Sequence, residues 1–181
     1  MADTFSGAHE DAGVATLENL AGKYLTFRLA SEEYGLEILK VQEIISLLEV
    51  THIPQVPKFV RGVINLRGKI IPIVDLRLKF GMPGKEDSDR TSIIVVGLSR
   101  LFNNLIMGIV VDEVSEVLDI AEGQIEPAPS FGAKVKTDFI LGMGKVDKRV
   151  LTLLDIDRVL SETEIETVAS AADAEPVTID N

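Results

Sequence analysis

One pattern of residues occurs twice in this chain of 181 residues, and the repeat limits the folds that the chain can adopt. Phe-Val-Arg-Gly at 59–62 aligns with Phe-Ile-Leu-Gly at 139–142, and the match continues without a gap to Asp75 and Asp155. Glycine falls on glycine, aspartate on aspartate, and apolar pairs on apolar pairs. The pattern predicts two copies of one strand–turn–strand unit, each followed by a short helix.

The segments upstream of this unit also match, at a spacing of 73 residues instead of 80, so that Gly35 aligns with Gly108 and Glu43 with Glu116. The second copy therefore has seven more residues before its hairpin, which a surface loop can accommodate. Each copy has about 65–70 residues, which is small for a stable core, so we expect the copies to pack around a shared third core. Chance similarity between strands rich in Val and Ile is the alternative, but the matched Gly and Asp positions favour duplication.

Apolar and polar residues alternate along many short segments, which is typical of strands. Segment 41–45 fits either a short helix or a continued strand. No long helical pattern lies between the predicted strands, so the sequence favours an all-β fold with short helices over alternating βαβ units. The segments predicted as strands are Tyr24–Leu29, Tyr34–Leu39, Gly62–Leu66, Lys69–Val74, Ser92–Leu98, Leu105–Val111, Val114–Ile120, Phe139–Val146 and Arg149–Leu154.

Glycine, aspartate and serine mark the ends of several predicted elements. Gly68 lies between two apolar runs, where a tight hairpin turn needs a positive φ. Asp75 and Asp155 are placed to cap the short helices that follow the two hairpins. Ser161 with Glu164 matches a capping box, which predicts a C-terminal helix.

The net charge of −11 is concentrated at the two ends of the chain. Residues 1–20 and 161–181 contain acidic residues and no Lys or Arg, whereas the segment between them is almost neutral. We expect a disordered acidic tail over 1–20, a folded domain over 21–160, and an acidic helix and tail over 161–181. The repeat divides the folded domain into approximate halves, 21–85 and 86–160, between which strands can be exchanged.

The composition also disfavours some partners and compartments. The sequence offers no basic face that could neutralise phosphates, so nucleic acid is not expected as a partner. The N-terminus lacks the basic and apolar regions of a signal peptide, and no stretch of about 18 apolar residues could span a membrane. A cytoplasmic protein without membrane insertion is therefore predicted.

No combination of residues typical of a catalytic or metal site is evident. The chain has no Cys, and its two histidines, His9 and His52, are far apart in the sequence. The glycines of 62–69 and 142–145 lack the Gly-Lys-Ser/Thr ending of a phosphate loop. The acidic segment 112–116 could hold a divalent cation weakly, although its spacing matches no calcium loop. We therefore predict no enzymatic activity, no metal and no cofactor.

Features of a binding surface are better represented. Val41, Ile44 and Ile45 lie beside charged residues, and Arg67 projects from the predicted hairpin tip close to Asn65. An arginine at a loop tip often marks a contact with a partner. A solvated turn residue is an equally good interpretation, and the residues alone leave both open.

Longer segments resemble a known family, the bacterial chemotaxis coupling proteins of the CheW family. The resemblance extends in order over roughly residues 22–160. It is carried by EYGLEILKVQEI at 33–44, GVINLRGKIIPIVDLR at 62–77, GIVVDEV at 108–114 and FILGMG at 139–144.

This resemblance implies two SH3-like five-stranded β-barrels related by an approximate two-fold axis. It also implies an adaptor that bridges the cytoplasmic tip of a chemoreceptor to the regulatory domain of the histidine kinase CheA, at membrane-associated receptor arrays. Because that kinase domain has the same fold, the pairing would be barrel to barrel, and the receptor helix would lie in the apolar groove between the barrels.

The family's coupling surface carries over to a set of residues in the first copy of the repeat. Within this set the resemblance implies an ion pair between Arg67 and Glu43. The predicted partner-binding residues are Val41, Glu43, Gly62, Asn65, Arg67 and Ile70.

Two other functions are weaker alternatives. A hybrid coupling protein with a phosphorylatable receiver would need a second polypeptide, because the chain is too short to hold a receiver. An enzyme built on a barrel scaffold would need clustered titratable groups, and a fold by itself confers no activity.

Overall fold

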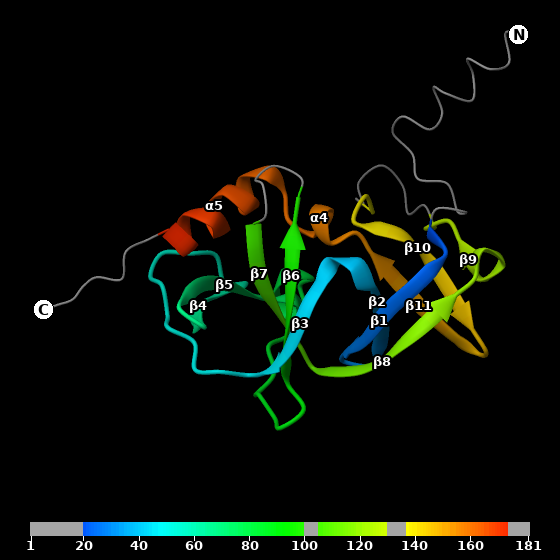
Figure 1. Cartoon of the computed structure of the whole chain (residues 1–181), viewed down its shortest axis with the longest axis horizontal. Coiled ribbons are helices and arrows are strands. Elements are labelled where there is room, and N and C mark those ends of the chain that lie inside the picture. The colour runs from blue at the N-terminus through cyan, green and yellow to red at the C-terminus, as the bar shows by residue number, and fades with distance from the viewer. Residues whose placement is uncertain (1–19, 100–104, 130–136, 174–181) are drawn as a thin grey trace, which may run out of the picture.

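The computed structural model describes residues 20–99, 105–129 and 137–173, and its strands form two sheets that lie side by side (Figure 1). One sheet has five strands in the order β3-β6-β7-β5-β4. These strands are β3 (Val41–Ser46), β4 (Val60–Leu66), β5 (Lys69–Asp75), β6 (Ser92–Leu98) and β7 (Leu105–Val111).

The other sheet has six strands in the order β8-β1-β2-β11-β10-β9. They are β1 (Gly22–Leu29), β2 (Glu32–Glu37), β8 (Glu113–Ile120), β9 (Ile125–Glu126), β10 (Ile140–Val146) and β11 (Arg149–Leu154). The helices are short except for the last, which lies over β4 and β5 (Figure 1). They are η1 (Ile38–Lys40), α3 (Leu76–Lys79), η2 (Glu122–Gln124), α4 (Ile156–Val159) and α5 (Glu162–Asp173).

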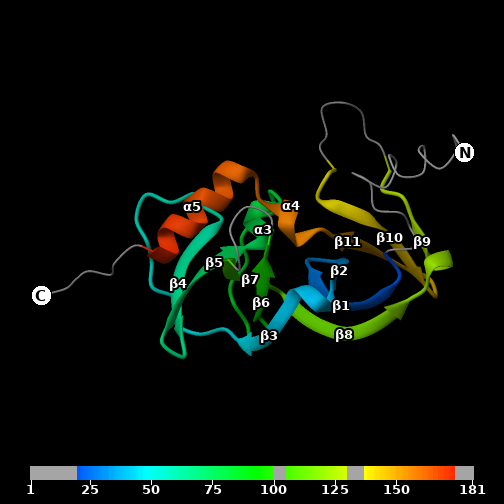
Figure 2. The same cartoon turned by 45° about the horizontal axis from the view of Figure 1, so that its top comes forward.

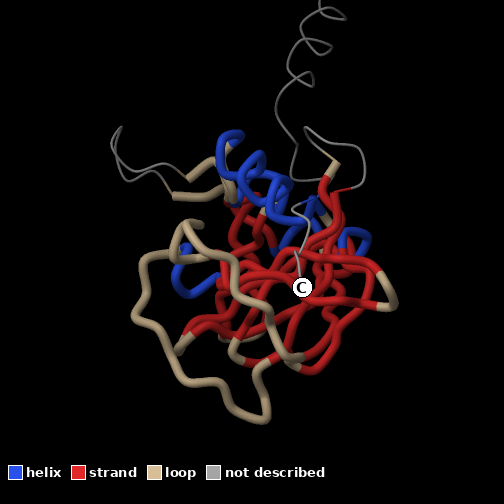
Figure 3. Tube along the Cα trace, turned by 90° about the vertical axis from the view of Figure 1, so that its left-hand side faces the viewer, coloured by secondary structure: helices blue, strands red, loops and turns tan. Residues whose placement is uncertain are grey.

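The predicted all-β class is confirmed, although curved open sheets take the place of closed five-stranded barrels; β8 shows the curvature clearly (Figure 2). One sheet has a sixth strand because the two-residue strand β9 pairs with β10. In the five-stranded sheet, the edge strands β3 and β4 are not paired with each other. Instead, a long loop follows β3 (Figure 3). Its residue Thr51 exchanges two backbone hydrogen bonds of 2.8 and 2.9 Å with Val63 of β4.

The predicted duplication is present in the strand register. In the β4–β5 hairpin Gly62 faces Ile73, and in the β10–β11 hairpin Gly142 faces Leu153, with a bulge at the same place in each. After each hairpin, the backbone N–H of the capping aspartate donates to the carbonyl of an aromatic residue, Phe59 or Phe139. Similar apolar strands that matched by chance would not share a bulge position.

Strands of the two copies are exchanged between the sheets. β2, which contains Gly35 of the first copy, pairs in parallel with β11 of the second copy. β7, which belongs to the second copy, pairs in parallel with β5 of the first copy. As a result, the five-stranded sheet is built from residues 41–111, and the six-stranded sheet from 22–37 and 113–154. These sheets do not follow the division into 21–85 and 86–160, because each copy contributes two strands to the sheet of the other: β1 and β2 join the six-stranded sheet, and β6 and β7 join the five-stranded sheet.

The local motifs have the predicted geometry. Arg67 and Gly68 both have positive φ, at 53° and 86°, so a two-residue turn closes the β4–β5 hairpin. The carboxylates of Asp75 and Asp155 accept backbone N–H groups in the first turns of α3 and α4. At α5, the Glu164 N–H donates to Ser161 Oγ at 3.1 Å and the Ser161 N–H donates to Glu164 Oε1 at 2.8 Å, which is the predicted capping box.

The crossover between the sheets settles the ambiguous segment near residue 40. The predicted strand Tyr34–Leu39 ends at Glu37, and the turn η1 redirects the chain into the other sheet. Segment 41–45 is a strand, because β3 pairs antiparallel with β6. Pairing across the sheet, which local periodicity does not report, therefore decides this element.

Three apolar clusters stabilise the fold. One lies within the six-stranded sheet around Tyr24 and Leu153, and one within the five-stranded sheet around Ile73 and Ile93. The third and largest is the predicted shared core, to which both sheets and α5 contribute side chains. Its members include Phe27, Leu36, Leu154, Val74, Ile94, Ile109, Ile165 and Val168.

The chain ends are described only in part. Leu20 is buried, and its carbonyl accepts a 2.5 Å hydrogen bond from the Tyr24 hydroxyl, so the folded part already includes the last residue of the predicted tail. Residues 1–19 and 174–181, where most of the expected disorder falls, lie outside the described residues. None of the described helices has the length and apolar run that a membrane span requires.

Candidate functional site

The predicted ion pair between Arg67 and Glu43 is present, with Arg67 Nη2 donating to Glu43 Oε2. Arg67 lies at the tip of the β4–β5 hairpin, and Glu43 lies on β3 at the opposite edge of the five-stranded sheet. The pair therefore joins two edges that have no strand pairing between them. The Arg67 side chain is 70% exposed and that of Glu43 is 30% exposed, so the guanidinium remains available to a partner.

A side chain of the hairpin itself supports the tip. Asn65 Oδ1 accepts the backbone N–H of Gly68 at 2.8 Å. Non-glycine residues rarely adopt the positive φ of Arg67, so the turn presents this side chain at some cost in backbone strain. A preorganised tip loses less entropy on binding than a mobile loop would.

Gly62 is buried and does not offer a surface for contact. Its φ is +142°, and a Cβ atom at this position would lie 1.9 Å from the carbonyl oxygen of Thr51. The glycine is therefore required by the close approach of the loop after β3. Among the predicted partner-binding residues, Gly62 therefore has a clear structural role, which is to let the loop after β3 approach β4.

The other two predicted residues are half-buried. Val41 packs against the shared core, and Ile70 faces Asn65 across the hairpin. The structure thus brings Glu43 and Arg67 into direct contact, with Asn65 and Ile70 on the same hairpin. Val41 lies two residues from Glu43 on β3 and belongs mainly to the interior.

The prediction missed most of an exposed apolar strip along the chain from η1 through β3 into the loop that follows it. Among the large apolar side chains that are exposed, Leu39 is 95%, Ile44 is 45% and Leu48 is 42% accessible. We call these three residues the apolar strip. The sequence marked Ile44 as a surface candidate, but Leu39 falls at the end of a predicted strand and Leu48 in a segment with no assigned element. Alternation alone could not show which of them face outward.

A shallow cavity of about 260 Å³ adjoins the start of the strip. It lies on the six-stranded side of the seam, which is the boundary between the two sheets. It is lined by residues 20–24 before and within β1 and by Glu37, Ile38 and Leu39 at the end of β2 and in η1. An exposed apolar strip that continues into a hollow is a common form of a protein-binding groove.

The second copy of the repeat has a different charge pattern at the equivalent place. Asp147 stands where the first copy has Arg67, and Glu116 stands where it has Glu43. Glu116 instead accepts from Arg149 at 3.3 Å, and Arg149 also makes a bidentate pair with Glu33 at 2.9 and 3.0 Å. The two ends of the molecule are therefore chemically distinct, although their backbones are related.

The Glu33–Arg149 pair makes stability depend on pH. The hydrogen bonds from Arg149 hold the pKa of Glu33 below its usual value, so the pair's contribution is present above about pH 4.5 and is lost as the pH falls through the lowered pKa. We expect Glu33→Gln to cost about 1 kcal/mol of unfolding free energy at pH 7 and much less at pH 3. Urea unfolding at both values measures this; an equal cost at both would contradict the assignment.

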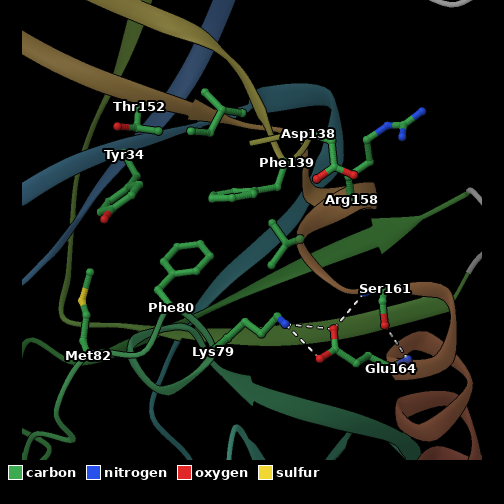
Figure 4. A pocket seen from close by; sticks show the side chains of 12 residues that line it. Tyr34, Lys79, Phe80, Met82, Asp138, Phe139, Thr152, Arg158, Ser161 and Glu164 are labelled. Atoms are coloured by element: carbon green, nitrogen blue, oxygen red, sulfur yellow. Dashed lines mark hydrogen bonds and ion pairs between the residues drawn. The ribbon is translucent and has the colours of Figure 1, made fainter. Parts of the chain in front are cut away.

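A larger cavity, of about 650 Å³, lies at the seam itself (Figure 4). Part of its wall is a row of aromatic rings, Tyr34, Phe80 and Phe139, whose neighbouring centroids are 5.8 and 5.5 Å apart. None of the six predicted residues lines it. The lining residues are Tyr34, Lys79, Phe80, Met82, Asp138, Phe139, Ile140, Thr152, Arg158, Val159, Ser161 and Glu164.

The polar groups of this larger cavity have partners within the fold. Lys79 Nζ donates to Glu164 at 2.9 Å, and Ser161 and Glu164 cap α5 (Figure 4). Burial would raise the pKa of Glu164, but the Ser161 N–H and Lys79 together lower it, so the carboxylate is ionised at neutral pH. The Ser161 hydroxyl serves as a helix cap, an arrangement that anchors α5 and provides no nucleophile–base pair.

The alternative of a cation site at 112–116 is not supported. Asp112 pairs with Arg77, Glu113 with Arg90, and Glu116 with Arg149. Among the residues that the structure describes, no group of three or more potential ligands could hold a metal ion. The three acidic side chains point to three separate arginines and serve to join elements.

The model of one protein family, described as the CheW-like domain, matches residues 23–164. The chain belongs to this family. The chemotaxis protein CheW of Klebsiella aerogenes is 44% identical over 166 residues, which cover 89% of this chain and 98% of that protein. The CheW of Bacillus subtilis is 33% identical over 141 residues, covering 77% and 87%.

A solved structure supports the same assignment. The crystal structure of the scaffolding protein TtCheW from Thermoanaerobacter tengcongensis matches with a TM-score of 0.70 and 35% identity, over 80% of this chain and 95% of that one. The resemblance of the four sequence segments to the CheW family is thus confirmed, and so is the expected chemotaxis adaptor role. The family match ends inside α5, so the first turn of that helix belongs to the region shared with the family.

Proposed function

We propose that this CheW-family adaptor bridges the cytoplasmic tip of a chemoreceptor and the regulatory domain of the histidine kinase CheA, without catalysing a reaction itself. In this proposal it acts in the cytoplasm at membrane-associated receptor arrays. The observation that carries the proposal is the Arg67–Glu43 pair, which presents an exposed guanidinium at the hairpin tip next to β3, whose Ile44 belongs to the apolar strip.

The apolar strip supports a helical partner. A helix that docks on a protein surface contributes apolar side chains spaced three or four residues apart, and these need an apolar receiving surface of matching length. Leu39, Ile44 and Leu48 provide such a surface, and the cavity next to Leu39 could take one projecting side chain. We therefore assign the receptor helix to this side of the seam, beside Val41 and Glu43.

The hairpin tip supports a polar contact with a partner. Arginine is enriched at the energetic centres of protein interfaces because its planar group can donate several hydrogen bonds at once. Asn65, Arg67 and Ile70 are held on one hairpin, and Gly62 lets the loop after β3 pack tightly against it. We assign Asn65, Arg67 and Ile70 to the coupling surface, and Gly62 supports this surface from within the fold.

Arg67→Ala and Glu43→Ala are expected to weaken partner binding by about tenfold or more, since each removes half of the presented ion pair. Stability should change by less than about 1 kcal/mol because the Arg67 end of the pair is well exposed. Isothermal titration against a soluble receptor-tip fragment and against the isolated kinase regulatory domain measures the binding.

A matched control is Lys145→Ala, which removes an exposed cation from an ion pair with Glu126 in the six-stranded sheet. This variant should bind both partners as the unmodified chain does. If Arg67→Ala instead unfolds at a much lower temperature, the arginine is structural. If the unmodified chain retains neither partner, the bridging proposal is wrong.

A further inference from the structure

The chain passes between the two sheets at two crossovers. The first, from β2 to β3, consists of η1; the second, from β7 to β8, is the single residue Asp112. Because the sheets exchange strands here, the conformation of these short links determines how one sheet is oriented against the other. Both crossovers contain a charged residue that makes an ion pair with the helical turn after a hairpin.

At the first crossover, Lys40 Nζ donates to Asp157 Oδ2 at 2.8 Å. Asp157 belongs to α4, which follows the last strand of the six-stranded sheet, and its other oxygen accepts the N–H of Ser99 at the end of β6. One carboxylate therefore joins the crossover, the six-stranded sheet and the five-stranded sheet. The Lys40 and Asp157 side chains are only 28% and 17% exposed.

At the second crossover, Arg77 Nη1 donates to Asp112 Oδ2 at 2.5 Å. Arg77 belongs to α3, which follows β5 of the five-stranded sheet, and the same Asp112 oxygen accepts the N–H of Ala30 at 2.7 Å. Ala30 forms the turn between β1 and β2 of the six-stranded sheet, with a φ of 56°. This carboxylate likewise joins both sheets and the crossover.

The helix ends of the two ion pairs occupy equivalent positions in the repeat and carry opposite charges. Arg77 and Asp157 both stand two residues after the helix-capping aspartates, Asp75 and Asp155. In one copy the helix supplies the cation and the crossover the anion; in the other the roles are reversed. Both copies thus join a crossover to the short helix after a hairpin with opposite polarity, although Asp112 stands one position before the residue that aligns with Lys40.

The surroundings of Lys40 make its charge important. Its ammonium faces three carboxylates, those of Glu37, Asp155 and Asp157, of which Asp155 also pairs with Arg158. Burial raises the pKa of both Glu37 and Asp155, so these groups are poorly solvated. Without the Lys40 ammonium the remaining acids repel one another, and the crossover would move away from α4.

We propose that the Lys40–Asp157 and Arg77–Asp112 ion pairs are positioning elements that set the angle between the two sheets and thereby hold the apolar strip in place. The effect on the strip rests on the proposed function, because Leu39 directly precedes Lys40 and β3 begins directly after it. The effect on the angle between the sheets does not depend on any partner.

The chain contains no cysteine, so two spin labels can be attached selectively. Ser46→Cys on β3 and Lys148→Cys on the β10–β11 turn are exposed positions in different sheets. Pulsed electron–electron resonance on the doubly labelled chain should give one narrow distance distribution. Lys40→Gln and Arg77→Gln should each broaden and shift this distribution, and the double variant should do so further. Lys40→Arg, which keeps the positive charge, should give the same narrow distribution as the unmodified chain.

The matched control is Lys23→Gln, which removes a cation from the Lys23–Asp119 pair within the six-stranded sheet and should leave the distribution unchanged. Circular dichroism confirms that each variant remains folded, and Asp157→Asn replaces Lys40→Gln if that variant does not fold. An unchanged distribution in Lys40→Gln and Arg77→Gln, or an equal change in Lys23→Gln, overturns the proposal.

A second readout separates this inference from the proposed function. If the ion pairs position the strip, Lys40→Gln lowers affinity for the receptor-tip fragment by about tenfold, and Lys40→Arg recovers it. If the unmodified chain binds neither partner, the bridging function fails, while the spin-label distances still decide the role of the ion pairs. If the distances change and receptor affinity does not, positioning of the strip is excluded.

Discussion

Gly62→Ala is expected to cost about 3 kcal/mol of unfolding free energy, although the change adds a single methyl group. A Cβ atom would lie 1.9 Å from the Thr51 oxygen and 2.8 Å from its carbonyl carbon, and the φ of +142° disfavours any side chain. Backbone atoms cannot yield as a flexible side chain does, so the two hydrogen bonds between Thr51 and Val63 must break. Urea unfolding followed by circular dichroism measures the loss.

Other glycines of the chain provide graded controls. At Gly68 the φ is 86°, and an added Cβ atom would meet nothing within 4 Å. In Gly68→Ala, backbone strain alone should therefore cost about 1 kcal/mol of unfolding free energy. Gly123→Ala has open space around it, and its φ lies outside the positive range, so its cost should be close to zero. Gly142→Ala, the equivalent change in the second copy, meets Glu126 oxygen at 2.9 Å and should fall between Gly68→Ala and Gly62→Ala. Equal costs at Gly62 and Gly68 would show that the close approach of Thr51 is not the cause.

Phe27→Ala is expected to cost about 3–5 kcal/mol, since it empties a large volume in the shared core. The Phe27 side chain is fully buried, and its ring stacks on Tyr34 with centroids 5.7 Å apart. Both sheets and α5 contribute to this core, so its loss should destabilise the whole molecule in one transition. Differential scanning calorimetry measures the enthalpy and the number of transitions.

The control for this prediction is Val117→Ala, an exposed apolar truncation on β8, which should change stability by less than about 0.5 kcal/mol. Two separate transitions in Phe27→Ala, with one sheet still folded, would show that the sheets are independent units. That outcome would also remove the physical basis for a fixed angle between them.

Much of the fold could be predicted because it depends on short-range chemistry. The turn at Arg67 and Gly68, the caps at Asp75 and Asp155, and the box formed by Ser161 and Glu164 each involve residues within a few positions of one another. The duplication was visible because two copies of one backbone need glycine and aspartate at the same places. The Arg67–Glu43 pair was a different case, because it followed from resemblance to a family and not from local pattern.

Other features were beyond local pattern. The need for glycine at position 62 comes from Thr51 in a loop that precedes β4, and the segment 41–45 is a strand because β6 pairs with it. Leu39 and Leu48 lie just outside β3, in η1 and in the loop after the strand, and only the structure shows that their side chains are exposed. For Gly62 and for segment 41–45, the contacting residues that decide the structure lie outside the local segment, in the loop around Thr51 and in β6.

By itself, the amino-acid sequence determined the class of fold, the repeat, the turns and caps, and the family resemblance, because periodicity and backbone preference act over a few residues. Only the tertiary structure decided how the copies exchange strands, which apolar side chains remain exposed, and how Lys40 and Arg77 find their partners 117 and 35 residues away. Those contacts depend on the packing of two sheets around a common core, and packing brings together residues whose spacing in the chain carries no sign of their contact.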